Sequence, residues 1–366
     1  MAVPLAPAAP PTLREIAQRA GLSHTTVSLS LRNDPSIPER TRARVRSLAD
    51  AMGYRSNLLV SALMTQVRLR QRQATPEVVG FLTGGPTEAD WKNHSASVGF
   101  YEGARHRAQQ LGMRLETFWL GPTGLRADET CRMLRARAIR GNLIAPFPLP
   151  VYAKPLDWSY LICVALGYAF RSQPLPRATH HHFRGSFTAV ENLRRLGYRR
   201  IGLMLAPDEN SRVGYSWLGG YLSAQQVLGT APLTPLFAPD FGDAGAIRRW
   251  LAHEKPDAII GFGPKQMSAL AAAGCSIPRD VAFAALDVQQ ARLNAVNDVA
   301  GIDQNLPVIG ATAMDLLAIQ LYHNEHGLPQ GPVLSMVEGR WVDGKTAPRR
   351  EARSPRRRAR RPRKRA

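Results

Sequence analysis

The segment TLREIAQRAGLSHTTVSLSLR, residues 12–32, decides the fold of the N-terminal part of the chain. Thr12 and Glu15 have the spacing of a capping box, in which each side chain satisfies the backbone N–H group of the other residue, so a helix is predicted to begin there. Gly21 supplies a turn conformation that residues with a Cβ atom resist, and Ser23 is placed to cap a second helix. Two short helices joined by a tight turn predict a helix-turn-helix, a geometry that lays its second helix in the major groove of DNA.

The apolar residues of both predicted helices recur at helical spacing and give each helix one inward face. These residues are Leu13, Ile16, Ala17, Ala20, Val27 and Leu31. A third helix is predicted at residues 39–52, after Pro38 and before Gly53. We therefore expect residues 12–56 to form one small helical headpiece.

Residues 12–57 resemble the headpiece of the LacI/GalR-family transcriptional regulators. The shared pattern is an Ile-Ala or Val-Ala pair, then Ala-Gly-(Val/Leu)-Ser, and then Thr-Val-Ser. In this chain the pattern reads Ile16, Ala17, Ala20, Gly21, Leu22, Ser23, Thr26, Val27 and Ser28, with Tyr54 and Asn57 at the family's tyrosine and asparagine positions. The resemblance implies a homodimer that binds a palindromic operator in double-stranded DNA and regulates transcription, in our interpretation as a repressor.

The resemblance also implies which residues contact DNA. His24 and Thr25 match the two positions that choose the operator sequence; a histidine can pair with a base edge, and a threonine methyl can meet thymine. Leu29 stands where many members have an arginine, so we expect an operator that differs at the matching base. The predicted DNA-binding set is Ser23, His24, Thr25, Thr26, Ser28, Leu29, Asn33, Tyr54, Asn57 and Leu63. The alternative for His24 is that it is only an exposed helix residue.

A hinge helix is expected at residues 57–65, whose first eight residues are NLLVSALM. So short a helix is marginal alone in water, and in the family it forms only when two copies meet on the operator. Leu63 matches the leucine that wedges between base steps, where the contacts of a kinked duplex offset the cost of unstacking. The alternative is that this segment merely caps the headpiece core.

Positive charge is concentrated at the two ends of the chain. The formal net charge is +20; residues 12–72 hold eleven arginines and four acids, and residues 349–366 hold eleven basic residues and one acid, which leaves +20 − 7 − 10 = +3 for the rest. This placement favours neutralisation of nucleic-acid phosphates. We expect the tail, residues 348–366, to be disordered and to add nonspecific DNA affinity, the alternative being an incidental extension.

Composition bounds the class of protein. The chain has 366 residues, of which 44% are hydrophobic, so two or three domains with a real core are expected. Residues 1–11 lack the basic and apolar blocks of a signal peptide and are expected to form a disordered arm, and no apolar run is long enough to span a membrane. Cys131, Cys163 and Cys275 have neither disulfide nor metal-ligand spacing, so we expect reduced core thiols in a cytoplasmic protein.

From residue 76 onward the pattern predicts strands alternating with helices, which requires parallel sheets covered on both faces. The expected strands lie at 78–85, 115–120, 142–148, 161–167, 200–206, 257–263 and 281–287, and the expected helices at 98–111, 129–138, 183–196, 218–228, 246–254 and 266–273, with a last helix from Pro307. Two successive α/β halves imply a cleft at the carboxyl ends of their strands.

This part of the chain resembles the periplasmic-binding-protein-like core of the same family, through LRRLGYRRIGLM (193–204), GCSIPRDVAFAALD (274–287) and AGIDQNLPVIGATAMDLL (300–317). The expected fold class is therefore α/β: a helix-turn-helix headpiece followed by two interleaved parallel α/β subdomains. The expected bounds are 66–76 for a linker, 77–178 with 302–326 for the first subdomain, and 179–301 with 327–347 for the second.

The family's ligand pocket is only partly matched. Trp217 stands at a family arginine position, Gly263 and Pro264 replace an Asn-Asp pair, and His181 replaces an aspartate, whereas Asp287 is retained. Aromatic rings can stack on a ligand, although a core role is the alternative for each ring taken singly. The predicted effector-binding residues are Trp91, Tyr101, Trp217, Asp287 and Gln304, and the resemblance implies a small-molecule, carbohydrate-like effector that modulates DNA affinity.

An enzyme is not expected. His180, His181 and His182 are consecutive, so on an extended segment their side chains would diverge and would not converge on a metal ion. The sequence has no phosphate-binding glycine loop, nucleophile elbow or HExxH motif, and no cofactor or catalytic residue is predicted. The alternative function is a small-molecule-binding α/β protein whose basic ends associate with nucleic acid without sequence preference. That alternative does not explain the joined headpiece and hinge.

Overall fold

The computed structural model describes residues 11–52, 54, 76–122, 126–146, 156–168, 173–239, 241–294 and 296–350. The predicted hinge with Asn57 and Leu63, nearly all of the predicted linker and arm, and residues 351–366 of the tail lie outside the described residues. No helix in the described part of the chain is long and apolar enough to cross a membrane.

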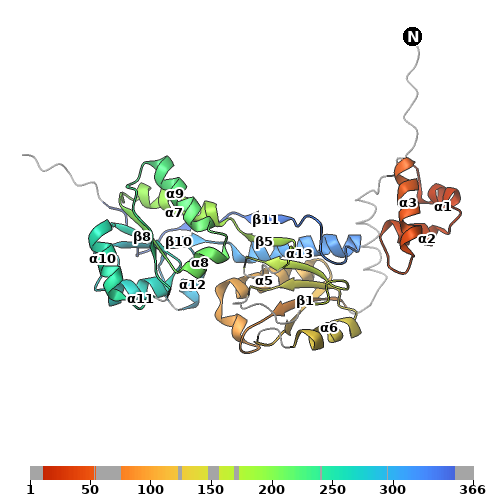
Figure 1. The fold of residues 1–366 in the computed structure, drawn as a ribbon, viewed down its shortest axis with the longest axis horizontal. Coiled ribbons are helices and arrows are strands. Elements are labelled where there is room, and N and C mark those ends of the chain that lie inside the picture. The colour runs from red at the N-terminus through yellow and green to blue at the C-terminus, as the bar shows by residue number, and fades with distance from the viewer. Residues whose placement is uncertain are drawn as a thin grey trace, which may run out of the picture. The chain divides into compact units, whose positions relative to one another are not determined.

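The headpiece has the three helices that the sequence predicts: α1 (Leu13–Ala20), α2 (His24–Leu31) and α3 (Glu39–Ala51) (Figure 1). The capping box at Thr12 and Glu15 is confirmed, because the backbone N–H of Thr12 donates to Glu15 Oε2 at 2.6 Å and that of Glu15 donates to Thr12 Oγ1 at 3.4 Å. Gly21 ends α1 with φ 64° and ψ 34°, the left-handed conformation that favours glycine. Ile16, Ala17, Ala20, Val27, Val45 and Ala49 form the buried core of the headpiece.

The chain divides into two compact units that interleave. The first comprises residues up to Lys92, then Ser97–Thr179 and Pro307–Ser335; the second comprises Asn93–Ala96, His180–Leu306 and the residues from Met336. Because each unit takes separate segments of the chain, the predicted fold class of a headpiece with two interleaved α/β subdomains is confirmed.

The α/β part of the first unit is built on a six-stranded sheet of order β11-β5-β4-β3-β1-β2. The strands are β1 (Glu77–Thr83), β2 (Met113–Trp119), β3 (Gly141–Ile144), β4 (Ile162–Leu166), β5 (Arg177–His180) and β11 (Leu334–Val337), and the helical elements are η1 (Asp90–Asn93), α5 (Ser95–Gln110), α6 (Ala127–Ala136) and α13 (Leu306–His323). β1 and β2 pair in parallel from Glu77 opposite Met113 to Thr83 opposite Trp119. β3 and β4 are buried along their whole length, as strands covered on both faces must be.

The second unit has a six-stranded sheet of order β12-β10-β9-β8-β6-β7, in which only β12 is antiparallel to its neighbour. The strands are β6 (Ile201–Leu205), β7 (Leu236–Phe237), β8 (Ala258–Gly261), β9 (Ala282–Ala285), β10 (Ala300–Asp303) and β12 (Arg340–Val342). The helices are α7 (His182–Arg195), α8 (Pro207–Arg212), α9 (Ser216–Leu228), α10 (Ala244–Glu254), α11 (Pro264–Ala272) and α12 (Val288–Leu293). α7 and α9 lie on one side of this sheet and α10 and α11 on the other (Figure 1).

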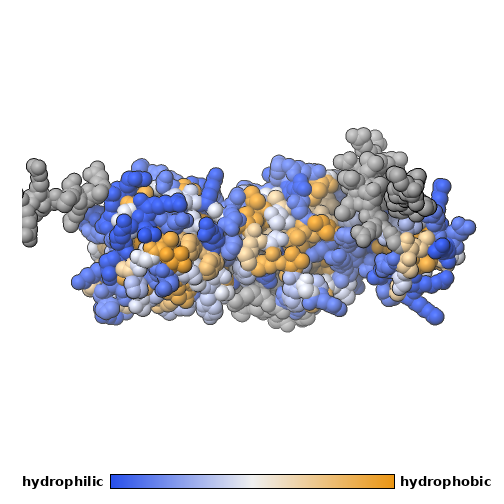
Figure 2. Space-filling view, turned by 90° about the horizontal axis from the view of Figure 1, so that it is seen from above, coloured by the Kyte–Doolittle hydropathy of each residue, from blue (hydrophilic) through white to orange (hydrophobic). Residues whose placement is uncertain are grey.

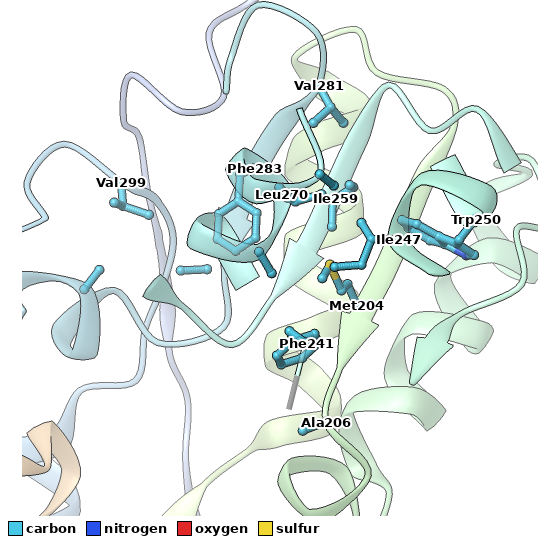
Figure 3. Packing of buried hydrophobic residues seen from close by; sticks show 14 of the residues in the cluster. Met204, Ala206, Phe241, Ile247, Trp250, Ile259, Leu270, Val281, Phe283 and Val299 are labelled. Atoms are coloured by element: carbon cyan, nitrogen blue, oxygen red, sulfur yellow. The ribbon is translucent and has the colours of Figure 1, made fainter. Parts of the chain in front are cut away.

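The core of the second unit lies between its sheet and helices α10 and α11. Met204, Ile259 and Phe283 project from neighbouring strands toward Ile247 and Leu270 on the helices, as Figure 3 shows. This packing holds the carboxyl ends of β6, β8 and β9 together, and these are the ends at which a ligand site is expected.

The three consecutive histidines are arranged differently from the prediction. His180 ends β5, His181 caps α7, and His182 is the first residue of that helix, so the segment is not extended throughout. The His180 and His182 rings meet edge to face with centroids 5.1 Å apart. The prediction of diverging side chains is wrong, because the chain turns from strand to helix at His181. In the described part of the chain, no group of three or more His, Cys, Asp or Glu side chains is placed to hold a metal ion.

Acid is expected to destabilise the fold through His180, which is 2% exposed. Burial lowers its pKa to about 4, against about 6.5 in an unfolded chain. Because the folded pKa is the lower one, the unfolded state binds the proton first as pH falls, and stability is lost from about pH 6.5 down to about pH 4, by roughly 3 kcal/mol for this residue. Urea unfolding of His180→Gln should show a weaker loss between pH 7 and pH 4.5 than the parent chain. His106→Gln, on the exposed surface of α5, is the control, and an equal pH dependence in all three proteins would contradict the prediction.

The close packing of α7 against α9 should tolerate no side chain at Gly220. A Cβ atom there would lie 2.1 Å from the carbonyl oxygen of Phe183 and 2.2 Å from Ser186 Oγ, so the helices would have to separate. We expect Gly220→Ala to lower the free energy of unfolding by about 1–3 kcal/mol in urea titrations. The neighbouring Gly219→Ala is the matched control, because its Cβ would make an ordinary 3.6 Å contact with Phe183 and should stabilise the helix by about 0.5–1 kcal/mol. Equal unfolding midpoints for the two variants would refute the assignment.

Candidate DNA interface and ligand site

The N-terminus of α2 presents exposed side chains on a rigid turn. Ser23 Oγ accepts the backbone N–H of Thr26 at 3.0 Å and so caps the helix, and it also lies within hydrogen-bond distance, 2.8 Å, of Thr26 Oγ1. His24 and Thr25, the predicted base-reading residues, are exposed immediately after this cap. Their side chains are therefore available to a groove while the backbone beneath them is held.

Asn33, in the loop after α2, is hydrogen-bonded to two arginines of α3. Its backbone has φ 57°, its Oδ1 accepts from the Arg46 guanidinium at 2.9 Å, and its carbonyl oxygen accepts from Arg42 at 3.2 Å. Glu39 also pairs with both arginines. This loop therefore has a structural role, and the predicted phosphate contact of Asn33 stays a prediction.

The remaining predicted DNA contacts in the described headpiece are less exposed. Ser28 and Leu29 are half-buried on α2, and Tyr54 packs against the headpiece core. Burial raises the pKa of the Tyr54 hydroxyl, so this group stays protonated and can act as a hydrogen-bond donor. The described headpiece holds seven of the eleven arginines counted in residues 12–72 and all four acids.

Asp287 follows β9 and caps α12 in the second unit. Its carboxylate accepts backbone N–H groups from Gln289 at 2.9 Å and Gln290 at 3.1 Å, and the hydroxyl of Ser95 at 3.0 Å. The side chain is buried, and this burial raises its pKa despite the three hydrogen bonds and the nearby Arg212. A carboxylate has about four acceptor positions, so the internal bonds leave about one for a ligand.

Gln304 lies beside the same edge, directly after β10. Its Nε2 donates to the carbonyl oxygen of Leu286 at 2.8 Å, which ties the end of β10 to the end of β9. Asp303, the residue before it, accepts from Gln289 at 2.8 Å and from Arg340 at 3.0 Å. The structure thus brings the predicted residues Asp287 and Gln304 to neighbouring strand ends.

A second polar pair at this edge was not predicted. Glu209, after β6, accepts the backbone N–H of Ala206 and the Nε2 group of Gln266, each at 2.9 Å, and Gln266 accepts the N–H of Gly263 at 3.1 Å. Burial raises the pKa of Glu209. The sequence signal is the repeated pattern of a proline two residues before Glu or Gln at a helix start.

Trp217 is 1% exposed in the first turn of α9. The centroid of its ring lies 5.0 Å from that of His182 and 5.6 Å from that of Phe262. The Arg212 guanidinium in turn lies over the Phe262 ring, 4.9 Å from its centroid. Among the described residues, none is a hydrogen-bond partner of the Nε1 atom of Trp217. Trp217 therefore packs against Phe262, the ring that Arg212 covers, and a direct contact of Trp217 with a ligand stays a prediction.

The other two predicted ligand residues belong to the first unit. Trp91, on η1, and Tyr101, on α5, pack against each other with centroids 5.1 Å apart, and both rings contact Phe81 of β1. Trp91 is buried and Tyr101 is half-buried. The structure brings these two together as an aromatic cluster, which also satisfies the core alternative.

Two protein families match separate parts of the chain. Residues 12–57 match the family described as bacterial regulatory proteins, lacI family, and residues 190–347 match the periplasmic binding protein-like domain. The probable HTH-type transcriptional repressor ExuR of Bacillus subtilis (strain 168) is 40% identical over 55 residues, which are 15% of this chain and 16% of that protein. The chain spans only 16% and 53% of the lengths of the two curated relatives that it matches first.

Solved structures of other proteins share the fold, and two of them illustrate the likeness. The transcriptional regulator CelR in its cellobiose complex has a TM-score of 0.56 and 18% identity, over 92% of this chain and 99% of that chain. The lac repressor dimer bound to operator and the anti-inducer ONPF has a TM-score of 0.54 and 19% identity, over 93% and 99%. At these identities the likeness concerns the fold alone. A headpiece of the lacI family of bacterial regulatory proteins, a periplasmic binding protein-like core and this shared fold together support a regulator of that family.

Proposed function

We propose that this protein is a DNA-binding transcriptional regulator that acts as a homodimer on a palindromic operator and represses transcription. The observation that carries the proposal is the capped N-terminus of α2, where Ser23 and Thr26 hold the backbone and His24 and Thr25 remain exposed. In a helix-turn-helix these are the positions that meet base edges. The lac repressor structure, a dimer on its operator, and the repressor name of ExuR support this choice.

The remaining DNA contacts are part of the same proposal. Thr26, Ser28 and Asn33 contact phosphates and set the register, which gives affinity without reading sequence. Leu63, in the hinge, inserts between base steps at the operator centre. Leu29, in place of an arginine, removes a guanine-directed fork, so sequence readout rests on fewer direct contacts.

Substitution of the base-reading residues should change sequence preference. In a binding-site selection on random duplexes, His24→Ala and Thr25→Ala should each relax the preference at one half-site position, with a loss of about 1–3 kcal/mol on the parent's best operator. Gln18→Ala, exposed on α1, is the control and should keep the parent's half-site. Recovery of the parent half-site by both α2 variants would disprove the assignment.

The alternative function is a small-molecule-binding protein with nonspecific nucleic-acid association. A gel-shift titration separates the two, because a regulator binds the selected palindrome more tightly than a scrambled duplex of equal length. Equal affinity for both duplexes would favour the alternative. Salt dependence alone does not discriminate, because nonspecific binding shows it as well.

We further propose that a small, carbohydrate-like effector binds at the carboxyl edge of the second unit's sheet and modulates DNA affinity. This edge offers the carboxylate of Asp287, the amides of Gln304 and Gln290, and the Phe262 ring stacked on Arg212. Carboxylates and amides pair with hydroxyl groups, and aromatic rings cover apolar sugar faces. The cellobiose bound to CelR supports this class of ligand, and Trp91, Tyr101 and Trp217 stay predicted contacts.

Asp287→Asn should separate ligand binding from helix capping. Asparagine caps helices as well as aspartate does, so the variant should fold, but it loses the charged acceptor for a ligand hydroxyl, worth about 1.5–3 kcal/mol. In a thermal-shift series with sugars and sugar acids, we expect the ligand that stabilises the parent to bind this variant about ten-fold or more weakly. Asp243→Asn, at the exposed cap of α10, is the matched control. A parent-like response from Asp287→Asn would exclude that carboxylate from the site.

A further inference from the structure

A group of exposed arginines surrounds an open depression at the C-terminal end of α7. The depression measures about 310 Å³ and is lined by Glu191, Arg194, Arg195, Arg199 and Leu228. The three arginines are exposed, and only one of the five lining residues is apolar. The visible surface of this unit is largely hydrophilic and also carries a hydrophobic patch (Figure 2).

The last described residues of the chain are fixed against the turn that carries these arginines. The carbonyl oxygen of Pro348 accepts the Tyr198 hydroxyl at 2.6 Å, and the backbone N–H of Arg350 donates to Leu196 at 2.8 Å. The Arg350 guanidinium pairs with Asp257 at 2.6 Å and lies 5.0 Å from the Tyr198 ring. The structure therefore delivers residue 350, and with it the start of the arginine-rich tail, to the edge of the depression.

The local charge is strongly positive. We define the α7 basic surface as Arg194, Arg195, Arg199, Arg200, Arg349 and Arg350, which are all exposed. The neighbouring acids are Glu191, bonded to Arg195 at 3.2 Å, and Asp257, which accepts backbone N–H groups of Arg199 and Arg200 and the Arg350 guanidinium. Six arginines against two committed carboxylates give +4, and residues 351–366 add nine basic residues and one acid, or +8.

We propose that the α7 basic surface binds the phosphate backbone of duplex DNA, as a second contact separate from the headpiece. A guanidinium group can donate two parallel hydrogen bonds to the oxygens of one phosphate, and all six side chains of the α7 basic surface carry this group. A lipid surface is a poorer fit because a membrane contact needs apolar anchors among the charges, and Leu228 is the one apolar residue of the five that line the depression. Single-stranded RNA is a poorer fit because it needs exposed aromatic rings, and Tyr198 is buried beneath Arg350.

This contact is independent of sequence, because it is made to phosphates, which carry no sequence information directly. The inference rests on the proposed function only for the choice of DNA as the polyanion. Its consequence is a higher affinity for any duplex and a steeper loss of affinity with salt than the headpiece gives alone.

The test measures how the affinity of the full chain for a scrambled 30-bp duplex depends on salt. Binding is measured by fluorescence anisotropy between 50 and 200 mM NaCl. Each phosphate contact contributes about 0.9 to the slope of log affinity against log salt. The triple variant Arg194→Gln, Arg195→Gln, Arg199→Gln should reduce the slope by about 2–3, and truncation after Arg350 should reduce it further while keeping the docked segment. The variant Arg248→Gln, Arg249→Gln, with exposed arginines of α10 outside the depression, is the matched control and should change the slope by less than 1. Thermal midpoints establish that each variant is folded.

A triple variant with the parent's slope, or with the same change as the α10 control, would overturn the proposal. Phosphatidylserine vesicles and single-stranded RNA are parallel probes at equal salt; tighter binding of either one than of the duplex, lost in the triple variant, would also overturn it. The triple variant should keep the parent's selected half-site, since that preference belongs to α2. A failure of sequence preference in the parent chain would reject the regulator while leaving this measurement valid.

Discussion

The unpaired backbone N–H groups at helix starts determine the polar chemistry of the second unit. Its central strands are buried on both faces, so polar side chains are accommodated where strands end and helices begin. Each of these helix starts needs an acceptor for its first N–H groups. Asp287 supplies it at α12, Glu209 at α8 and Gln266 at α11, and the same three side chains form the polar edge that a ligand would meet. The residues that cap these helices are therefore the same ones that the proposed ligand site uses.

The headpiece follows the same physical rule with a different outcome. The Ser23 hydroxyl caps α2, and the next two side chains, which take no part in this cap, are exposed. A capped helix start carries a partial positive charge, which favours the approach of a phosphate to this end of α2. The first turn is thus suited both to docking on the DNA backbone and to presenting His24 and Thr25. The predicted roles of Ser23 and His24 differ for this reason, although the two residues are adjacent.

Much of the fold was predictable because its signals are local. Buried parallel strands read as continuous apolar runs, so VVGFLT and DAIIG were recognised, and the capping box at Thr12 fixed the start of α1. Helix starts were less accurate: α5 begins at Ser95 and α6 at Ala127, a few residues before the expected 98 and 129. The histidine run was misjudged because three identical residues carry no signal for the point where a strand becomes a helix. Local patterns thus located elements better than their junctions.

Site residues were predictable from the sequence only where a single residue at a family position indicated them. Asp287 and Gln304 were identified from the family pattern, but the bond between Glu209 and Gln266 joins residues 57 positions apart, and no local pattern reports it. Trp217 was identified by its position, whereas its burial behind Phe262 depends on how α9 packs on α7. Contacts across the fold set the surroundings of a site residue, and a single sequence does not encode them in any one segment.

The second unit separates its two chemistries along the strands. Arg199 and Arg200 precede β6, whereas Glu209 follows it, so the α7 basic surface lies at the amino edge of the sheet and the polar residues lie at the carboxyl edge. A five-residue strand spans roughly 16 Å. Asp287 is buried, so salt does not screen it as it screens a surface charge, but at this distance and an effective dielectric of about 20 two unit charges interact by only about 1 kcal/mol. Any stronger coupling between ligand and DNA must then act through a change of conformation that the two ligands favour unequally.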